Sequence, residues 1–438
     1  MSRYTKHKVD IITMGCSKNL VDSERLKRRL ESKGYIAAHN PEEPDGEYVI
    51  VNTCGFIGDA KEESVMMLLR LGELKAEGRI GHLAVMGCLS ERYRESLPAE
   101  MPEVDMWYGK FDWNGFVDSL PDLCATVQVK GWDRALTTPQ HSAYLKISEG
   151  CNRFCAFCAI PLITGRHTSR PSEEILEEVR SLVSKGVKEF NVIAQDLSSY
   201  GLDLYGEHRL AQLIDAMADI PGVEWIRLHY AYPADFPMDV LDVMARRDNV
   251  CKYLDIALQH SSDRILERMR RHVTKAETEE LLTEIRRRVP GIKIRTTLMV
   301  GFPGETEEDF AELMQFVKEQ RFDRMGAFAY SEEEDTYGQR NYADDIPEEV
   351  KQQRLDALMD LQATISEELA QEMVGKEVRL LVDETDGETL TCRSQWDSPE
   401  VDMTYDVTGA PDARTGDFIR AVITGADTFD FTARALES

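Results

Sequence analysis

Six short apolar runs alternate with helical patterns between residues 141 and 370, and this alternation limits the possible folds more than any other feature. The runs are AYLKIS, EFNVIAQ, WIRLHY, YLDIAL, IRTTLMVG and MGAFAYS. Strands that alternate with helices form βαβ units, whose strands lie parallel in one sheet. Six such units predict a TIM-like barrel, complete or incomplete, with its site at the carboxyl ends of the strands.

Three cysteines follow the first of these runs, in the segment EGCNRFCAFCAIP. Cys151, Cys155 and Cys158 have the spacing Cys-x-x-x-Cys-x-x-Cys, and three thiolates so close together can hold three irons of a [4Fe-4S] cube. No fourth cysteine follows within the segment, so one iron would stay open to a substrate or cofactor. This arrangement is typical of radical S-adenosylmethionine (SAM) chemistry. We therefore predict that this loop triad (Cys151, Cys155 and Cys158) is both catalytic and metal-binding.

A second set of cysteines lies in the first segment, residues 1–137. There the runs KVDIITM, YVIVNT and HLAVMG each precede a helical pattern, which predicts an open parallel α/β sheet. Cys16, Cys54 and Cys88 follow the three runs closely. Because the carboxyl ends of parallel strands line one crevice, we predict that this N-terminal triad (Cys16, Cys54 and Cys88) forms a second metal site. The alternative is three separate buried or redox cysteines, since cysteine is common in cores.

The last segment has a different pattern. It contains EVRLLVDE, TLTCRSQW, MTYDVTG, DFIRAVITG and FDFTARAL, separated by Gly, Asp and Pro, which predicts a small antiparallel β-barrel. A chain of 438 residues is long enough for several domains. We expect an α/β protein with three domains, 1–137, 138–370 and 371–438, and a linker at VKGWDRALTTPQH.

Composition and charge indicate a cytoplasmic protein with a basic partner. The sequence contains no run of about 18 apolar residues, so we expect no membrane span. The start MSRYTKHKVDIIT lacks the apolar stretch of a signal peptide. In the reduced cytoplasm, nine cysteines are better interpreted as metal ligands or core residues than as disulfides. The formal net charge of −27 suits a basic partner. A simpler interpretation is that the charge only keeps the chain soluble.

SAM needs groups that bind its amine, carboxylate, ribose and adenine, and the ends of the predicted barrel strands offer candidates. These cofactor-binding candidates are Gln195, Asp196, Gln259, Arg295, Gly301 and Gly304, with His260 beside them. Glycines at a strand end let the backbone approach a flat ligand closely. An arginine that faces the barrel would pair with a carboxylate such as that of SAM. The alternatives are a turn role for Gln259, a structural hydrogen-bonding role for His260, and an Arg295 that faces the helix layer.

Two phenylalanines of the cysteine loop and three cysteines outside the triads also need an interpretation. Phe154 and Phe157 lie inside the cysteine loop. They either control solvent access to a cluster or simply pack the loop. Three further cysteines have no partner at metal-ligand spacing and are expected to be buried or free: Cys124, Cys251 and Cys392.

Together these motifs resemble the methylthiotransferase family of radical SAM enzymes over essentially the whole chain. The matching motifs are MGCSKNLVDSE, NTCGF and MGC, then YLKISEGCNRFCAFCAIP, and finally a domain that looks like a TRAM barrel. MGCSKNLVDSE, AQDLSSYG, HYAYP and LDIALQH are similar to the branch that modifies a ribosomal protein, whereas the tRNA-modifying branch usually has Met in place of Lys18. The family often has Arg-Gly after the cysteine loop. Here Thr164 and Gly165 are followed by Arg166, which is the candidate for that arginine's role.

The resemblance implies two [4Fe-4S] clusters and SAM as cofactors. The loop triad would cleave SAM to a radical, and the N-terminal triad would hold the sulfur. The implied reaction adds a methylthio group to the β-carbon of an aspartate in small-subunit ribosomal protein S-twelve, free or in the small ribosomal subunit. Flavodoxin or ferredoxin would supply the electron, and no membrane is involved.

The charge of the terminal segment supports the ribosomal-protein branch. Residues 374–438 contain 14 acidic and 6 basic side chains. Such a barrel would repel RNA phosphates and attract a basic protein, so no direct tRNA substrate is expected.

Two rival functions stay open on the sequence alone. A tRNA adenosine methylthiotransferase has the same architecture and chemistry. A non-catalytic iron–sulfur or zinc-binding adaptor needs only metal binding. Structural zinc usually takes four ligands, however, and each triad offers three.

Overall fold

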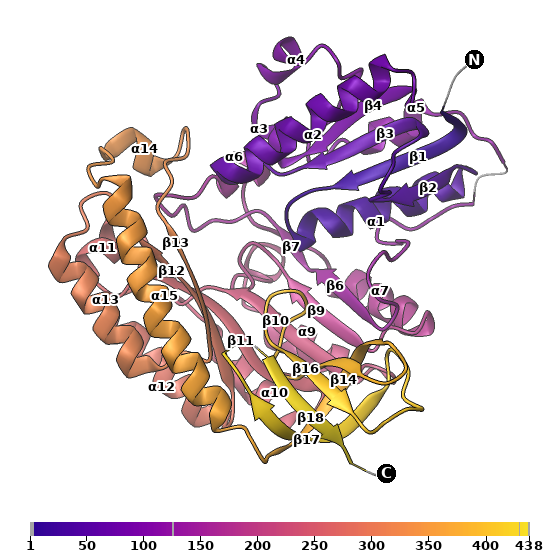
Figure 1. Cartoon of the computed structure of the whole chain (residues 1–438). Coiled ribbons are helices and arrows are strands. Elements are labelled where there is room, and N and C mark those ends of the chain that lie inside the picture. Colours follow the sequence, from indigo (N-terminus) through magenta and orange to yellow (C-terminus); the bar gives the residue numbers. More distant parts are fainter. Residues whose placement is uncertain (1–3, 125–126, 429, 437–438) are drawn as a thin grey trace.

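The computed structural model describes residues 4–124, 127–428 and 430–436 (Figure 1). The first residues of MSRYTKHKVDIIT, Phe429 of the run FDFTARAL and Glu437 therefore lie outside the described residues. Figure 1 shows an N-terminal sheet above, and a terminal barrel below, a central six-stranded sheet. Within the described part, no helix is both long and apolar enough to cross a membrane.

The N-terminal sheet has five strands, and all of its pairings are parallel, as the sequence predicts. In spatial order the strands are β2 (Ile36–His39), β1 (Thr5–Thr13), β3 (Gly46–Thr53), β4 (His82–Gly87) and β5 (Met106–Trp107). Successive residues of a strand point to opposite faces, so the continuous apolar runs bury both faces. Leu26 of α1 (Ser17–Ser32) covers one face, and Leu68 of α2 (Gly58–Ala76) covers the other. The short helices of this part are α3 (Cys88–Arg92), α4 (Leu97–Glu100) and α5 (Asn114–Ser119).

The central sheet contains all six apolar runs as parallel strands, and they lie in the sheet in the order of the chain. They are β6 (Ser142–Lys146), β9 (Glu189–Ile193), β10 (Trp225–Ala231), β11 (Val250–Gln259), β12 (Lys293–Val300) and β13 (Arg324–Ala329). β6 and β13 are the two edges, so the predicted barrel is an incomplete one. Eight strands close a TIM barrel, and six leave it open on one side.

Helices cover the outer face of the six-stranded sheet and complete its core. The long ones are α7 (Ser172–Ser184), α9 (Leu210–Ala218), α10 (Asp239–Arg246), α12 (Lys275–Arg288), α13 (Glu307–Gln320) and α15 (Glu348–Gln371). Val179 of α7, Leu282 of α12 and Phe316 of α13 are fully buried in that core. The short elements are β7 (Ser148–Glu149), α6 (Ile160–Thr164), β8 (Thr168–Ser169), α8 (Leu202–Tyr205), α11 (Asp263–Arg268) and α14 (Tyr337–Asn341).

The terminal barrel is closed and has five strands. In spatial order they are β14 (Glu377–Thr385), β15 (Leu390–Ser394), β16 (Thr404–Thr408), β18 (Asp430–Ala435) and β17 (Phe418–Ala426). Four pairings are antiparallel, as predicted, and the pairing of β16 with β18 is parallel. Strand direction reverses at every antiparallel pairing, so an odd number of strands cannot alternate all the way around a closed ring.

Buried ion pairs join the three parts. Glu189 on β9 pairs with Arg393 on β15 at 2.8 Å and with Arg227 on β10 at 2.8 Å. The expected linker contains Arg134, which is 1% exposed and pairs with Glu24 of α1 at 2.7 Å. This connection is therefore packed into the structure and is not a loose tether.

Candidate active site

All six cysteines of the two triads line one cavity of about 310 Å³ between the N-terminal sheet and the six-stranded sheet. The other polar and aromatic lining residues used below are Lys18, Lys110, Arg153, Phe157, Gln195, Tyr230, Tyr232, Gln259 and Arg271. The cysteines reach the cavity from two layers of the molecule, since the strands of both sheets end there. The cavity thus brings together cysteines up to 142 positions apart, from Cys16 to Cys158.

The N-terminal triad stands at three strand ends. Cys16 directly precedes α1, Cys54 directly follows β3, and Cys88 is the first residue of α3. Glycines make this approach possible. Gly15 has φ +83°, and a Cβ there would lie 2.8 Å from the Cβ of Cys54. Gly87 has φ +103°, and a Cβ there would lie 2.5 Å from Oδ1 of Asn52, so the repeated Met-Gly-Cys motif has a steric cause.

The loop triad lies between β7 and α6. The short strands β7 and β8 pair at the base of this loop. Gly150 has φ +78°, and a Cβ there would overlap the carbonyl oxygen of Arg166. The backbone N–H of Arg153 donates to Sγ of Cys151 at 3.5 Å, and Nη1 of Arg271 donates to Sγ of Cys155 at 3.3 Å. Neither arginine was among the sequence candidates. Arg153 lies inside the cysteine motif itself, whereas Arg271 lies after α11 and only the fold brings it close.

Among the thiols of the two triads, Cys16 has electrostatic surroundings of its own. Burial raises the pKa of Cys88 to about 12 and that of Cys151 to about 12. Burial also raises the pKa of Cys54 and of Cys158. For Cys16, burial raises the pKa, but the ammonium groups of Lys18 and Lys110 and two backbone N–H groups of α1 outweigh it and lower the pKa below its usual value. Iron binds thiolates, so cluster assembly must displace protons from most of these thiols.

The cavity suits anionic cofactors. Four cationic side chains line it: Lys18, Lys110, Arg153 and Arg271. In the described part of the chain, no Asp or Glu is among the lining residues. A four-iron cluster bound by three thiolates carries negative charge, as does the carboxylate of SAM. Oε1 of Gln195 and Oε1 of Gln259 are buried and have no hydrogen-bond partner among the residues described. These two oxygens are free to accept from an ammonium or hydroxyl group of SAM.

The spacing of the ligands also distinguishes a cluster from a single ion. Over residues 4–124, 127–428 and 430–436, no group of three or more His, Cys, Asp or Glu side chains could hold one metal ion. A cluster does not need that convergence, because each thiolate binds a different iron. The residues therefore fit two [4Fe-4S] clusters, with one triad for each.

A buried chain of charges connects the two sides of the cavity. Nζ of Lys110 donates to Oδ2 of Asp22 at 2.7 Å and to Oδ1 of Asn19 at 3.1 Å. Lys146 of β6 pairs with Asp22 and with Glu149, and Nε2 of Gln195 donates to Glu149 at 2.7 Å. Although burial raises the pKa of Asp22, the ammonium groups of Lys110 and Lys146 hold it well below its usual range. The lining residue Gln195 is thus held in place by contacts that run through Glu149 and Lys146 to Asp22 of α1 in the N-terminal part.

The structure places several sequence candidates outside the cavity lining. Asp196 accepts from Nε of Arg153 at 2.8 Å, and Arg295 pairs with Asp402 at 3.4 Å and with Asp255 at 3.7 Å. Arg295 therefore contacts protein carboxylates, one of them in the terminal barrel. Its position does not support contact with the carboxylate of SAM, because Arg295 does not line the cavity and its guanidinium already pairs with these two protein carboxylates.

The glycine candidates have a packing role in this structure. Gly301 has φ +72°, and a Cβ there would overlap the side chain of Lys351 on α15. The backbone N–H of Gly304 donates to Asp345 at 2.9 Å. His260 is buried, and its Nδ1 accepts from the backbone N–H of Ser262 at 3.0 Å, which fits a structural hydrogen-bonding role. None of these three residues lines the cavity.

The two phenylalanines of the cysteine loop differ in position: one lines the cavity, and the other is partly exposed to solvent. Phe157 lines the cavity and packs against Cys155 and Tyr232. Phe154 is 39% exposed, and the guanidinium of Arg166 lies 6.0 Å from the centroid of its ring. Arg166 is itself exposed and does not line the cavity. Among the other cysteines, Cys124 is exposed while Cys251 and Cys392 are buried.

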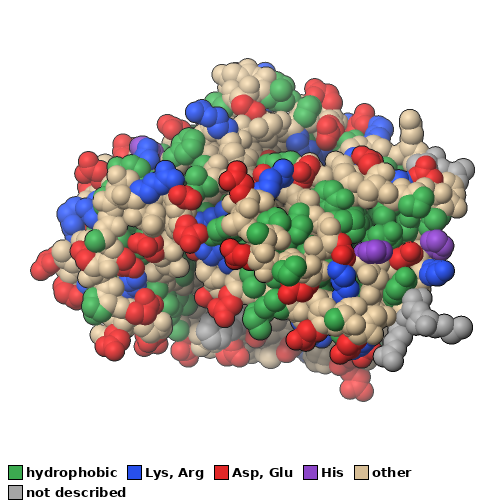
Figure 2. All heavy atoms as spheres, turned by 90° about the horizontal axis from the view of Figure 1, so that it is seen from above, with side chains coloured by type: hydrophobic (Ala, Val, Ile, Leu, Met, Phe, Trp, Pro, Cys, Tyr) green, Lys and Arg blue, Asp and Glu red, His purple; other side chains and the backbone are tan. Residues whose placement is uncertain are grey.

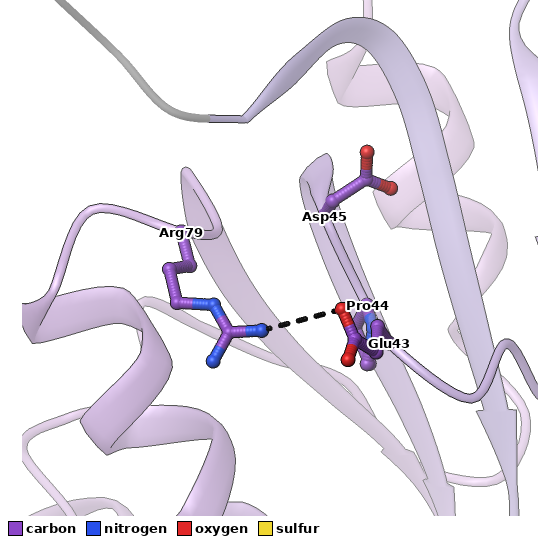
Figure 3. A pocket seen from close by; sticks show the side chains of 4 residues that line it. All are labelled: Glu43, Pro44, Asp45 and Arg79. Carbon is purple, nitrogen blue, oxygen red and sulfur yellow. Dashed lines mark ion pairs between the residues drawn. The ribbon is translucent and has the colours of Figure 1, made fainter.

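A second hollow of about 420 Å³ lies at the N-terminal sheet, away from the cysteines (Figure 3). It is lined by Glu43, Pro44, Asp45 and Arg79, and Arg79 pairs with Glu43 at 3.8 Å. It contains no thiol and no group suited to redox chemistry. The cysteine cavity is therefore the candidate active site.

Comparisons with known proteins show the family and the fold of the chain. Three family models match the chain: the Radical SAM superfamily over residues 145–317, the Uncharacterized protein family UPF0004 over 8–109, and the TRAM domain over 374–436. The protein named ribosomal protein uS12 methylthiotransferase RimO from Phocaeicola vulgatus is 57% identical over 433 residues, which cover 98% of this chain and 100% of that protein. Its namesake from Flavobacterium johnsoniae is 47% identical and covers 97% of each chain.

Solved structures with the same fold are more distant. The radical SAM methyltransferase TsrM from Kitasatospora setae, with cobalamin and a [4Fe-4S] cluster bound, matches with a TM-score of 0.53 and 15% identity over 74% of this chain and 75% of that one. The cobalamin-dependent radical enzyme OxsB matches with a TM-score of 0.51 and 12% identity over 82% of this chain and 57% of that one. At this identity the likeness concerns the fold alone.

Proposed function

This chain belongs to the RimO family of radical SAM methylthiotransferases, and from that premise we propose that it transfers a methylthio group to the β-carbon of an aspartate in ribosomal protein uS12. One observation carries the proposal: both cysteine triads open into the same cavity. A radical made at one triad and sulfur held at the other would meet the same substrate atom there.

The chain's own residues have defined roles in this proposal. The loop triad would hold the cluster that binds SAM, and the N-terminal triad would hold the second cluster. When bound, the clusters and SAM would supply the electron, the radical and the sulfur, and a second SAM would supply the methyl group. Gln195 and Gln259 would orient SAM through their free amide oxygens. Phe157 and Tyr232 form part of the cavity wall and limit the access of water to the reacting atoms.

The charge of the molecule supports a basic protein partner. Asp and Glu side chains are spread over the face that Figure 2 shows from above, and the whole chain has a formal net charge of −27. Such a surface would attract a basic ribosomal protein, free or in the small subunit, and would repel a bare RNA backbone. We place the enzyme in the cytoplasm, where its substrate is made, with flavodoxin or ferredoxin as the electron donor.

The test compares the two substrates of the rival functions. The enzyme, reconstituted anaerobically with iron and sulfide, is incubated with SAM and reductant and with either uS12 or tRNA. We expect mass spectrometry to find the added methylthio group on one aspartate of uS12 and none on tRNA. Modified tRNA with unchanged uS12 would support the rival tRNA enzyme instead, and colourless protein with bound zinc would support an adaptor.

A further inference from the structure

We propose that Lys18 binds the carboxylate of the target aspartate inside the cysteine cavity. This inference rests on the proposed function and adds to it the residue that recognises the substrate side chain. Lys18 lies in the first turn of α1, two residues after Cys16. Its side chain therefore reaches the cavity from the side of the N-terminal triad.

Lys18 is buried and points into the cavity. It is 8% exposed and is one of the lining residues. Its Nζ lies 3.3 Å from the centroid of the Tyr230 ring, which also lines the cavity. A cation over an aromatic face gains some electrostatic attraction, but it keeps its hydrogen-bond donors free.

The other three cations of the cavity already have partners. Lys110 pairs with Asp22 at 2.7 Å. Arg153 pairs with Asp196 at 2.8 Å. Arg271 donates to Sγ of Cys155 at 3.3 Å and to the carbonyl oxygen of Ala257.

The ammonium group of Lys18, by contrast, forms no ion pair and no hydrogen bond within residues 4–124, 127–428 and 430–436. Burial raises the pKa of the Asp255 carboxyl, and Lys18 is near enough to oppose that rise but not near enough to form an ion pair with it. Arg295 pairs with Asp255 instead, at 3.7 Å. Lys18 is thus the cavity cation that is free to bind an anionic ligand.

The ammonium group of Lys18 has no carboxylate partner in the described part of the protein, and the carboxylate of a ligand would supply one. The backbone of Tyr230 adds a second unusual feature, since it has φ +63° although Tyr230 is not a glycine. Residues held in this region of φ cluster at functional sites. The Tyr230 N–H donates to Asp255 at 3.2 Å, which holds the ring beneath Lys18.

The chemistry of the substrate fits this position. The β-carbon of an aspartate is bonded directly to the carboxyl carbon. A cation that holds the carboxylate therefore also fixes the β-carbon, to within one bond, in the space that both cysteine triads share. Asparagine has the same shape without the charge, so the inference predicts that the enzyme discriminates between the two.

The experiment measures binding of uS12 and of its target Asp→Asn variant to the reconstituted holoenzyme with SAM bound. We expect the wild-type enzyme to bind the aspartate form about tenfold to a hundredfold more tightly. Lys18→Met keeps the length of the side chain and removes its charge, and we expect the preference to disappear. Lys18→Arg should retain it. Lys318→Met makes the same change on the exposed face of α13 and should leave the preference intact.

The outcomes separate the inference from the proposed function. A wild-type enzyme that binds both forms equally, or a Lys18→Met enzyme that still prefers aspartate, would overturn the inference while the methylthio transfer stands. Loss of SAM cleavage in Lys18→Met without uS12 would assign Lys18 to the cofactor and also overturn it. SAM cleavage at the wild-type level, which the loop triad performs, shows that the Lys18→Met enzyme is folded. Failure of the wild-type enzyme to modify uS12 would refute the proposed function itself, and the inference with it.

Discussion

At the residue scale, the two cysteine triads share a cavity but have separate supports. Arg271 and the backbone of Arg153 donate to sulfurs of the loop triad. Lys18 and Lys110 lower the pKa of Cys16 in the N-terminal triad. Because the supports are separate, substitutions in one triad should leave the other able to bind its iron.

Replacing Cys16, Cys54 and Cys88 together with Ala tests the division of roles. We expect the iron content to fall from about eight to about four per chain, because one of two four-iron clusters is lost. SAM cleavage should remain, since the loop triad is intact, while methylthio transfer should stop. Iron analysis and quantification of 5′-deoxyadenosine measure both. Full iron with no SAM cleavage would contradict this division of roles, and the matching change of the loop triad is the control.

Replacing Arg271 with Gln tests its bond to the loop triad. The guanidinium donates to Sγ of Cys155, and such a donor stabilises the more negative, reduced cluster. We expect a more negative reduction potential of that cluster and slower SAM cleavage, measured by a redox titration followed by electron paramagnetic resonance. Arg287→Gln, on the exposed face of α12, should change neither. An unchanged potential in Arg271→Gln would contradict the role of the bond.

At the element scale, the strand ends and their glycines determine where the N-terminal triad can form. β1, β3 and β4 are neighbours in the sheet, in the order β1-β3-β4, so their carboxyl ends lie side by side. Gly87 ends β4 and directly precedes Cys88. Its backbone conformation leaves no space for a side chain, and this makes the turn sensitive to a single methyl group.

Replacing Gly87 with Ala should disturb the second cluster. At φ +103°, the new Cβ would lie 2.5 Å from Oδ1 of Asn52 and 2.6 Å from the carbonyl oxygen of Thr53. We expect a loss of roughly 2 kcal/mol or more in unfolding free energy, together with loss of about four irons. Gly78→Ala is the matched control, because Gly78 has φ +70° and nothing within 4 Å of the new Cβ. It should cost only about 1–2 kcal/mol and keep the iron.

At the scale of the whole molecule, Glu189 holds the terminal barrel against the six-stranded sheet. It is fully buried between Arg393 and Arg227. Replacing Glu189 with Gln leaves the buried guanidinium of Arg227 without its carboxylate and leaves Arg393 with Asp383 alone, which should cost about 3–5 kcal/mol. We expect a lower melting temperature and faster proteolysis between α15 and β14. Glu224→Gln, which breaks the exposed pair with Arg379, should cost less than about 1 kcal/mol.

The same ion pair predicts how stability depends on pH. Burial raises the pKa of Glu189, but Arg393 and Arg227 outweigh it and hold that pKa well below its ordinary value of 4.5. A carboxyl group with a lowered pKa stabilises the folded state above its unfolded pKa, and this contribution is lost as the pH falls. We expect the melting temperature of the wild-type protein to decrease as the pH is lowered from 4.5. In Glu189→Gln the melting temperature should decrease less steeply over the same range. Parallel curves for the two proteins would contradict this.

The sequence by itself determined the elements and the chemistry of the ligands. The apolar runs with helical patterns between them predict two parallel sheets, because buried parallel strands need apolar side chains on both faces. The spacing of Cys151, Cys155 and Cys158 is local, so the loop triad is readable from the chain. The parallel pairing of β16 with β18 was not predicted, because strand order around a barrel depends on contacts between distant segments.

Only the tertiary structure decided which residues share the cavity. Gln195 and Gln259 line it, whereas Arg295, Gly301 and Gly304 do not, although all five lie on or near strand ends. Arg271 enters it without any motif that marks it as a site residue, and Lys18 enters it from a motif that indicated the branch but no role in the site. The physical reason is that residues converge through the packing of one sheet on another, and the sequence pattern of a single strand does not contain that packing.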